Sequence, residues 1–234
     1  RWFDMEWKPQ FDTEEWKATL TDYLDMMNNY GPPGASSNGF NENLALFQQG
    51  KCGMWIDATV AASFVTDPKE SKVADSVGFA LFPEKGDLGN RGNWLWSWNL
   101  AIPASTTKAD AAKAFVAWAT SKHYTDLVAE QDGWRAAPPG TRTSLYENPD
   151  YKEAAPFAEM TLESINAVDT NKPSVQEIPY TGAQFVSIPE FQGIGTAVGQ
   201  QFSAALAGNV TADQALNNAQ QLTQREMMKA GYIK

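Results

Sequence analysis

The sequence predicts an α/β protein with mostly parallel strand pairing, because strand-like and helix-like segments alternate along its 234 residues. Apolar, strand-like runs lie at 52–56, at 77–82 and at 94–102, and segments with apolar residues three and four positions apart lie between and after them. With 43% hydrophobic, 12% aromatic and 20% charged residues, the chain has the composition of a folded globular protein. Its length allows one large core or two modest ones.

Capping and stop signals give approximate bounds for the helices. Asp12, with Glu15 at the capping-box position, predicts the start of a first helix that Gly31 ends. A second, short helix is expected over 42–49, because Gly50 occupies the C-terminal glycine position. Further helices are expected over 58–65, after Ser105, up to Gln131, after Asn148-Pro149, and from a capping box at Thr211 to just before Gly231.

Three tryptophans, Trp94, Trp96 and Trp98, occupy alternate positions at the third strand-like run. In an extended segment such residues share one face, with Asn93 and Asn99 beside them. Each indole buries on the order of 150–250 Å² and keeps an N–H donor. Such a face suits a ligand that has both C–H faces and hydroxyl groups, so we predict a sugar or a polyol. The alternative is that the indoles simply pack beneath a helix.

Composition argues against several other classes of protein. A net charge of −10, without a cluster of Lys and Arg, is the opposite of a nucleic-acid-binding footprint. Cys52 and His123 are the only residues of their types, too few for a disulfide or for a zinc site built on several Cys or His. No run of about 18 apolar residues is present to span a membrane, and no glycine-rich phosphate loop occurs. We therefore expect no nucleic acid, metal or cofactor.

Three further segments place polar or aromatic side chains where ligands bind in open α/β sheets, at the ends of strands. Asp57 follows the run at 52–56, and its carboxylate can accept hydrogen bonds from two hydroxyls of a polyol, unless it serves only as an N-cap. Trp134 and Arg135 place an indole beside a guanidinium with five donors, for which a surface salt bridge is the alternative. Phe191 lies at an expected helix start, where the residues favour a structural role.

Five segments, in order, resemble motifs of the family 1 extracellular solute-binding proteins of ABC transporters, the group that contains maltose-binding protein. Each motif alone is weak, but five in the right order are specific, and the resemblance covers nearly the whole chain. Trp96-Ser97, Asp57 and Trp134-Arg135 depart from the common pattern in a way that resembles the sorbitol/mannitol-binding branch. The five segments are 46–56 (LFQQGKCGMWI), 77–83 (VGFALFP), 98–103 (WNLAIP), the helix through Phe115, Trp118 and Ser121, and 142–149 (RTSLYENP).

This resemblance implies a periplasmic-binding-protein type II fold, in which a hinge joins two α/β lobes and the ligand lies between them. It implies that the chain supplies most of the C-terminal lobe and a piece of the N-terminal lobe. We expect residues 1–88 in the C-terminal lobe, 89–137 in a hinge crossing and N-terminal lobe segment, and 138–234 in the C-terminal lobe again. We also expect an N-terminal segment of the same protein to precede Arg1 and to supply part of the cleft.

The function implied by the resemblance is capture, without catalysis, of a sugar alcohol of the sorbitol or mannitol type, or of a related monosaccharide, in the periplasm. The partners would be this small molecule, a membrane permease of the ABC transporter and the missing N-terminal segment. Two alternatives stay open: a carbohydrate-active hydrolase with paired carboxylates, and a stand-alone carbohydrate-recognition module. The candidate ligand-binding residues are Asp57, Trp96, Trp98, Arg135, Trp134, Asn93, Trp94 and Phe191.

Overall fold

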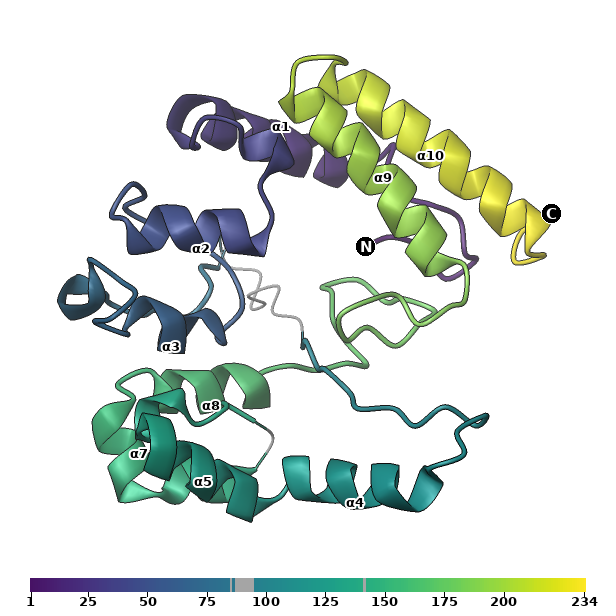
Figure 1. Cartoon of the computed structure of the whole chain (residues 1–234). Coiled ribbons are helices and arrows are strands. Elements are labelled where there is room, and N and C mark those ends of the chain that lie inside the picture. The colour runs from purple at the N-terminus through teal and green to yellow at the C-terminus, as the bar shows by residue number, and fades with distance from the viewer. Residues whose placement is uncertain (85, 87–94, 141) are drawn as a thin grey trace. The chain divides into compact units, whose positions relative to one another are not determined.

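The computed structural model of the chain describes residues 1–84, 86, 95–140 and 142–234 (Figure 1). In these ranges β-structure is limited to two isolated antiparallel bridges, Phe3 with Pro9 and Gly182 with Val186. Within the same ranges, none of the helices combines the length and the apolar character needed to cross a bilayer. The helical elements are α1 (Glu14–Tyr30), η1 (Ala35–Ser37), α2 (Phe40–Gln48), α3 (Ala61–Val65), η2 (Ala74–Ser76), α4 (Ala109–Ala119), α5 (Lys122–Asp132), η3 (Trp134–Ala136), α6 (Thr143–Glu147), α7 (Pro149–Ala154), α8 (Ala158–Asn166), α9 (Phe191–Leu206) and α10 (Ala212–Lys229).

The chain divides into two compact units, and each unit draws on separated stretches of the sequence. This division does not test the assignment of residues 1–88, 89–137 and 138–234 to lobes, which stays a prediction. Unit 1 comprises Arg1–Asn43, Pro83–Leu95 and Val168–Lys234, and unit 2 comprises Leu44–Phe82 and Trp96–Ala167.

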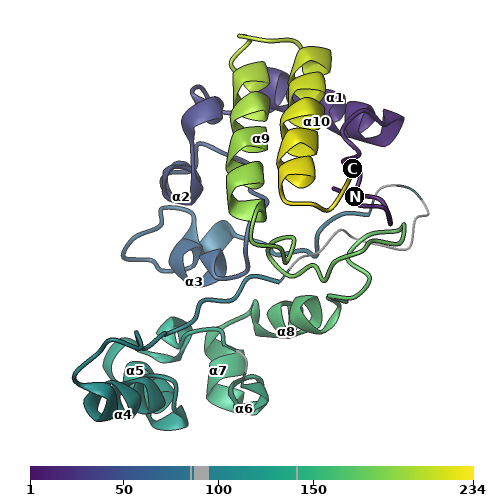
Figure 2. The same ribbon diagram turned by 90° about the vertical axis from the view of Figure 1, so that its right-hand side faces the viewer.

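In unit 1 the helices α9 and α10 lie side by side as an antiparallel pair, and α1 packs against both (Figures 1 and 2). The turn between them passes through Gly208, whose φ of 76° lies in the left-handed region that glycine adopts without strain. The expected capping box begins α10, since the Thr211 hydroxyl accepts a hydrogen bond from the Gln214 N–H (3.2 Å) and the Gln214 side chain accepts one from the Thr211 N–H (2.9 Å). This prediction is confirmed.

The start of α1 differs by one residue from the expectation. Its N-cap is Thr13, not Asp12, and no side-chain oxygen caps the first amides. The preceding backbone is fixed instead by α10: the Phe11 N–H donates to Gln220 Oε1, and Gln220 Nε2 donates to the Pro9 carbonyl, each at 2.9 Å. The prediction of Asp12 as the N-cap is therefore wrong by one residue, and contacts with a helix about two hundred residues further along the chain hold the segment that precedes α1.

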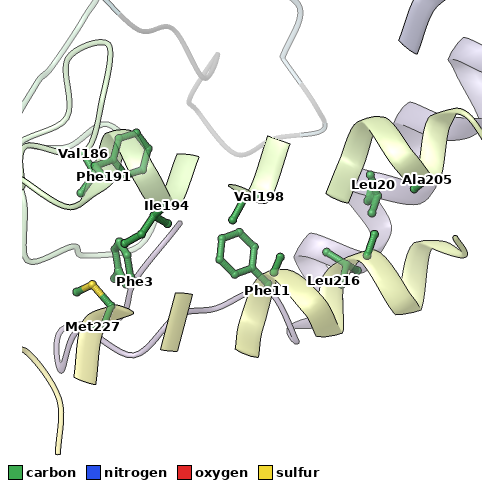
Figure 3. Close-up of a cluster of buried hydrophobic side chains, with 12 residues drawn as sticks. Phe3, Phe11, Leu20, Val186, Phe191, Ile194, Val198, Ala205, Leu216 and Met227 are labelled. Carbon is green, nitrogen blue, oxygen red and sulfur yellow. The ribbon is translucent and has the colours of Figure 1, made fainter. Parts of the chain in front are cut away.

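Aromatic rings and aliphatic side chains from α1, α9, α10 and the N-terminal segment form the core of unit 1 (Figure 3). Phe3 and Phe11 have no exposed surface. Trp2 packs edge-on against Phe11, with 5.2 Å between ring centroids, and against Phe191, with 4.8 Å. The first eleven residues are thus held to the helix pair by ring packing, although they form no strand.

Trp7 has a φ of 64°, in the left-handed region that residues with a Cβ rarely adopt. The side chain of Asp4 supports this turn, because its Oδ1 accepts hydrogen bonds from the N–H groups of Glu6 and Lys8, both at 2.9 Å. The indole of Trp7 lies on the ring of Tyr232, with 4.8 Å between centroids. Side-chain packing and the Asp4 hydrogen bonds therefore offset the cost of the backbone conformation.

Short helices build unit 2, with α6, α7 and α8 in mutual contact and η3 against α5 and α7. Asn148 begins α7 as predicted, since its Oδ1 accepts hydrogen bonds from the N–H groups of Asp150 (2.8 Å) and Tyr151 (3.2 Å), and proline follows it at the first helical position. The core of this unit is a separate cluster in which Tyr151 and Phe157 are fully buried.

The strand-like runs at 52–56 and 77–82 are not strands in the described structure. A strand requires a neighbouring strand to satisfy its backbone N–H and C=O groups, and the described residues place none beside these runs. The side chains expected in a buried sheet consequently remain exposed, with 88% of Met54 and 57% of Ile56 accessible. The described part of the run at 94–102 carries no strand either.

The helix expected after Ser105 is present as α4, but the face that would pack is not covered. None of the residues of α4 is buried. Its two aromatic side chains contact each other, with 5.9 Å between ring centroids, yet Phe115 is 58% exposed and Trp118 is 41% exposed. The prediction of a helix after Ser105 is confirmed.

Two tyrosines in the core of unit 2 provide a matched test of stability. The Tyr146 hydroxyl donates to the Gly140 carbonyl at 3.0 Å, whereas the Tyr151 hydroxyl is buried with no hydrogen-bond partner among the described residues. We expect Tyr151→Phe to raise the free energy of unfolding by about 1 kcal/mol and Tyr146→Phe to lower it by about 1 kcal/mol. Urea unfolding of both variants measures the two effects, and equal effects would contradict the assignment.

Tyr151 also predicts how the stability of the folded state changes at alkaline pH. Burial, and secondly the neighbouring Tyr146, raises the pKa of Tyr151 above its ordinary value. In the unfolded chain Tyr151 ionises near its ordinary pKa of about 10. Its contribution to stability is therefore fully present below about pH 10 and is lost as the pH rises toward the raised pKa of the folded state. Tyr151→Phe should reduce this alkaline loss of stability.

Candidate functional site

Of the predicted tryptophan face, the structure describes Trp96 and Trp98, in unit 2. Their rings meet edge to face, with 5.3 Å between centroids and 61° between planes. The two alternate residues thus lie together, as expected for one face of the segment. Trp98 is 85% exposed and Trp96 is 40% exposed, so both present indole surface on this unit. Asn93 and Trp94 lie outside the described residues.

Asp57 is exposed in unit 2, and its Oδ1 accepts a hydrogen bond from the Ala58 N–H at 2.7 Å. It is not the N-cap of the following helix, because α3 begins at Ala61 rather than at 58, and its N-cap is Val60. A turn closed by a hydrogen bond from the Ala61 N–H to the Ala58 carbonyl (3.0 Å) separates Asp57 from the helix. The capping alternative is therefore wrong, and the exposed carboxylate is able to accept further hydrogen bonds.

Trp134 and Arg135 lie in the short helix η3, which follows a Gly133 with φ of 87° and ψ of 157°. The Arg135 guanidinium bonds to two backbone carbonyls: Nη1 donates to Thr66 O at 2.6 Å, and Nε donates to Ala154 O at 3.3 Å. These partners are not carboxylates, so the arginine makes a different contact from the surface salt bridge considered above. Two of its five N–H donors are used in this way.

Trp134 is half-buried and has two environments. On one side it packs against the core cluster that contains Tyr151 and Phe157. It also lines a surface depression of about 360 Å³ that runs along α5. The other residues of this depression are His123, Asp126, Leu127, Ala129 and Glu130. Across the described ranges, no group of three or more His, Cys, Asp or Glu side chains is placed to hold a metal ion.

Phe191 lies in unit 1, whereas the other described candidates lie in unit 2. It is the first residue of α9 and only 9% of it is exposed. Its ring contacts those of Trp2, at 4.8 Å between centroids, and Phe185, at 6.2 Å. The structure thus gives Phe191 a place in the hydrophobic core, and its part in a ligand site stays a prediction.

Two groups that the sequence did not indicate complete this description: the carbonyls of Thr66 and Ala154, which accept from Arg135. Every residue has a backbone carbonyl, so the sequence does not indicate which carbonyls accept a hydrogen bond from a distant side chain. The helix end expected at Asp67-Pro68 is the one sequence feature that pointed to an unpaired carbonyl near Thr66.

Comparison with known proteins identifies the family. The profile described as "Bacterial extracellular solute-binding protein" matches residues 1–126, which is more than half of the chain. The chain belongs to this family.

Two relatives align with the whole chain. The mannitol-binding protein of Pseudomonas aeruginosa is 58% identical over 235 residues, which are 100% of this chain and 53% of that protein. The crystal structure of an ABC transporter solute-binding protein from Agrobacterium vitis, with bound D-mannitol, is 73% identical and superimposes with a TM-score of 0.97, covering 100% of this chain and 56% of that one. The chain therefore spans about half the length of these relatives.

More distant structures share the fold of this chain. Maltose-bound T. maritima MalE3 superimposes with a TM-score of 0.75 at 22% identity, over 96% of this chain and 53% of that one. The type II fold of periplasmic solute-binding proteins, predicted from the ordered motifs, is thereby confirmed, although the described residues contain no strand of their own.

Proposed function

We propose that the gene product containing this chain is the substrate-binding component of an ABC transporter and that it captures a hexitol, with D-mannitol as the first candidate. The observation that carries this proposal is the 73% identity, across the whole chain, with a protein crystallised with bound D-mannitol. The name of the Pseudomonas aeruginosa relative, at 58% identity, supports the same ligand class.

The side chains in unit 2 fit this chemistry. Trp96 and Trp98 offer indole faces for the C–H groups of a polyol, and the exposed carboxylate of Asp57 can accept hydrogen bonds from its hydroxyls. A site whose polar groups require hydroxyl partners discriminates strongly against analogues that lack them. Trp134, Asn93, Trp94 and Phe191 stay secondary candidates for ligand contact, and Arg135 belongs to the proposed site as the neighbour of Trp134 in η3.

The proposed role involves no chemical change in the ligand. The protein would be exported to the periplasm, would bind the polyol reversibly, and would deliver it to the membrane permease of the transporter. No step requires an acid, a base or a nucleophile. Members of this family are solute-binding proteins rather than enzymes, which favours this role over the hydrolase alternative.

Isothermal titration calorimetry of the gene product against D-mannitol, sorbitol, ribitol, glucose and maltose tests the proposal. We expect binding of D-mannitol in the micromolar range or tighter, that is, a binding free energy of about −8 kcal/mol or below, and weaker binding of glucose and maltose. Recovery of unchanged mannitol after prolonged incubation would support a binding protein. Binding of none of the five, or formation of a product, would refute the proposed function.

A further inference from the structure

We propose that Arg135 is a positioning residue: it holds the indole of Trp134 in place by bonding to the backbone of two helix ends, and it is not itself a hydrogen-bond donor to the ligand. This inference rests on the proposed function as far as Trp134 is taken to contact the polyol. The geometry on which it depends is independent of any ligand, since all the groups involved lie in unit 2.

The guanidinium joins the C-terminal ends of two helices that are far apart in the sequence. Thr66 is the C-cap of α3, and Ala154 is the last residue of α7. Carbonyls at helix C-termini lack a hydrogen-bond donor within the helix. A charged guanidinium placed there donates to these unpaired carbonyls. The bond to Thr66 O, at 2.6 Å, spans 69 positions in the sequence. The bond to Ala154 O is longer, at 3.3 Å.

Trp134 is the chain neighbour of Arg135, whose guanidinium bonds to the two carbonyls. It precedes Arg135 in η3. Two hydrogen bonds close this turn, from the Ala136 N–H to the Gly133 carbonyl and from the Ala137 N–H to the Trp134 carbonyl, both at 3.0 Å. Fixing the arginine head group therefore fixes the tryptophan backbone. The indole is then held between the core cluster and the depression along α5.

Asp57 precedes α3, and the carbonyl of Thr66 at the C-cap of α3 accepts a hydrogen bond from Arg135. Ala62 of α3 belongs to the core cluster against which Trp134 packs, and Thr66, at the end of α3, accepts from Arg135. The Thr66 hydroxyl in turn donates to the Ala62 carbonyl at 2.8 Å. Arg135 thus ties the segment that follows Asp57 to the turn that carries Trp134, which are two of the proposed ligand-binding positions.

The first test needs no ligand. The gene product is labelled with 5-fluorotryptophan, and the Trp134 resonance is assigned from its loss in Trp134→Phe. We expect Arg135→Ala to shift or broaden this resonance, and Arg135→Lys, which keeps the charge but loses the planar fork, to do so to a smaller extent. An unchanged Trp134 resonance in a folded Arg135 variant would overturn the proposal.

Arg142 offers a matched control in the same unit. Its Nε and Nη2 both donate to the carbonyl of Thr120, the C-cap of α4, at 3.1 Å and 2.6 Å. Arg142→Ala therefore removes the same kind of contact without touching η3, and it should leave the Trp134 resonance in place. A shift of equal size in Arg142→Ala would show that the fluorine signal reports general loosening, which would also overturn the proposal.

The second test separates positioning from direct contact. Arg135→Ala should lower the affinity for D-mannitol about tenfold in the wild-type background, because the indole of Trp134 is no longer held in place, and it should add nothing in the Trp134→Phe background. Losses that multiply would mean that Arg135 contacts the ligand itself, against the proposal. Failure of the wild-type protein to bind D-mannitol would refute the proposed function, and the fluorine result would still decide the role of Arg135.

Discussion

Replacing Asp57 with alanine is expected to weaken the binding of D-mannitol by the gene product about thirtyfold, because a charged acceptor for ligand hydroxyls is removed from the site. The exposed position of Asp57 and its place before α3, outside the helix cap, predict that the folded state is not affected. Calorimetric titration should therefore show the loss of affinity while the thermal midpoint of the unliganded protein stays within about a degree of wild type.

Asp67 provides the matched control for this substitution. It lies in the same unit, and its Oδ1 accepts a hydrogen bond from the Lys69 N–H at 2.9 Å, much as Asp57 accepts from the Ala58 N–H. Asp67→Ala should leave mannitol affinity unchanged. Equal losses in the two variants would indicate a general effect of removing negative charge, and an unaltered affinity in Asp57→Ala would remove Asp57 from the site.

Phe11→Ala is expected to produce the largest loss of stability, about 4 kcal/mol, because a fully buried ring is replaced with a cavity. Phe11 packs against Trp2 at 5.2 Å, Trp16 at 4.8 Å and Phe202 at 6.4 Å between ring centroids, so the cavity would lie among large aromatic groups that cannot easily close it. Urea unfolding followed by tryptophan fluorescence measures the change in the free energy of unfolding.

Phe185 is the comparison residue in the same unit. It is 52% exposed and contacts Phe191 at 6.2 Å between ring centroids. Phe185→Ala should cost less than about 1 kcal/mol, since much of the ring is already in water. If the two substitutions had similar effects, the packing described for the N-terminal segment would be incorrect.

Several helix ends of this chain were predictable because the signals that set them are local. Asn148 caps the helix that follows within three residues, the Thr211 capping box closes on Gln214, and Gly50 takes the left-handed conformation, with φ of 73°, that ends α2. Strands depend on a partner elsewhere, so the apolar patterns at 52–56 and 77–82 could indicate a suitable composition but not a pairing.

In the candidate site, too, the local contacts were predictable from the sequence and the contacts between distant segments were not. The contact between Trp96 and Trp98 follows from their spacing of two, and it was predictable. The bonds of Arg135 to two distant carbonyls, and the burial of Phe191 against Trp2, depend on tertiary packing that no local pattern encodes. Sequence motifs identified the family correctly because they report ancestry, which is information of a different kind from packing.

The left-handed turn at Trp7 has a consequence for the evolution of this position. Glycine would satisfy the backbone there but would remove the ring contacts with Phe3, Tyr180 and Tyr232. A β-branched residue would fail on both counts, because it strains the turn and offers no ring. The position therefore needs both an aromatic ring and a left-handed backbone, and neither glycine nor a β-branched residue meets both needs. We expect the position to diverge only together with its aromatic neighbours, as a group rather than one residue at a time.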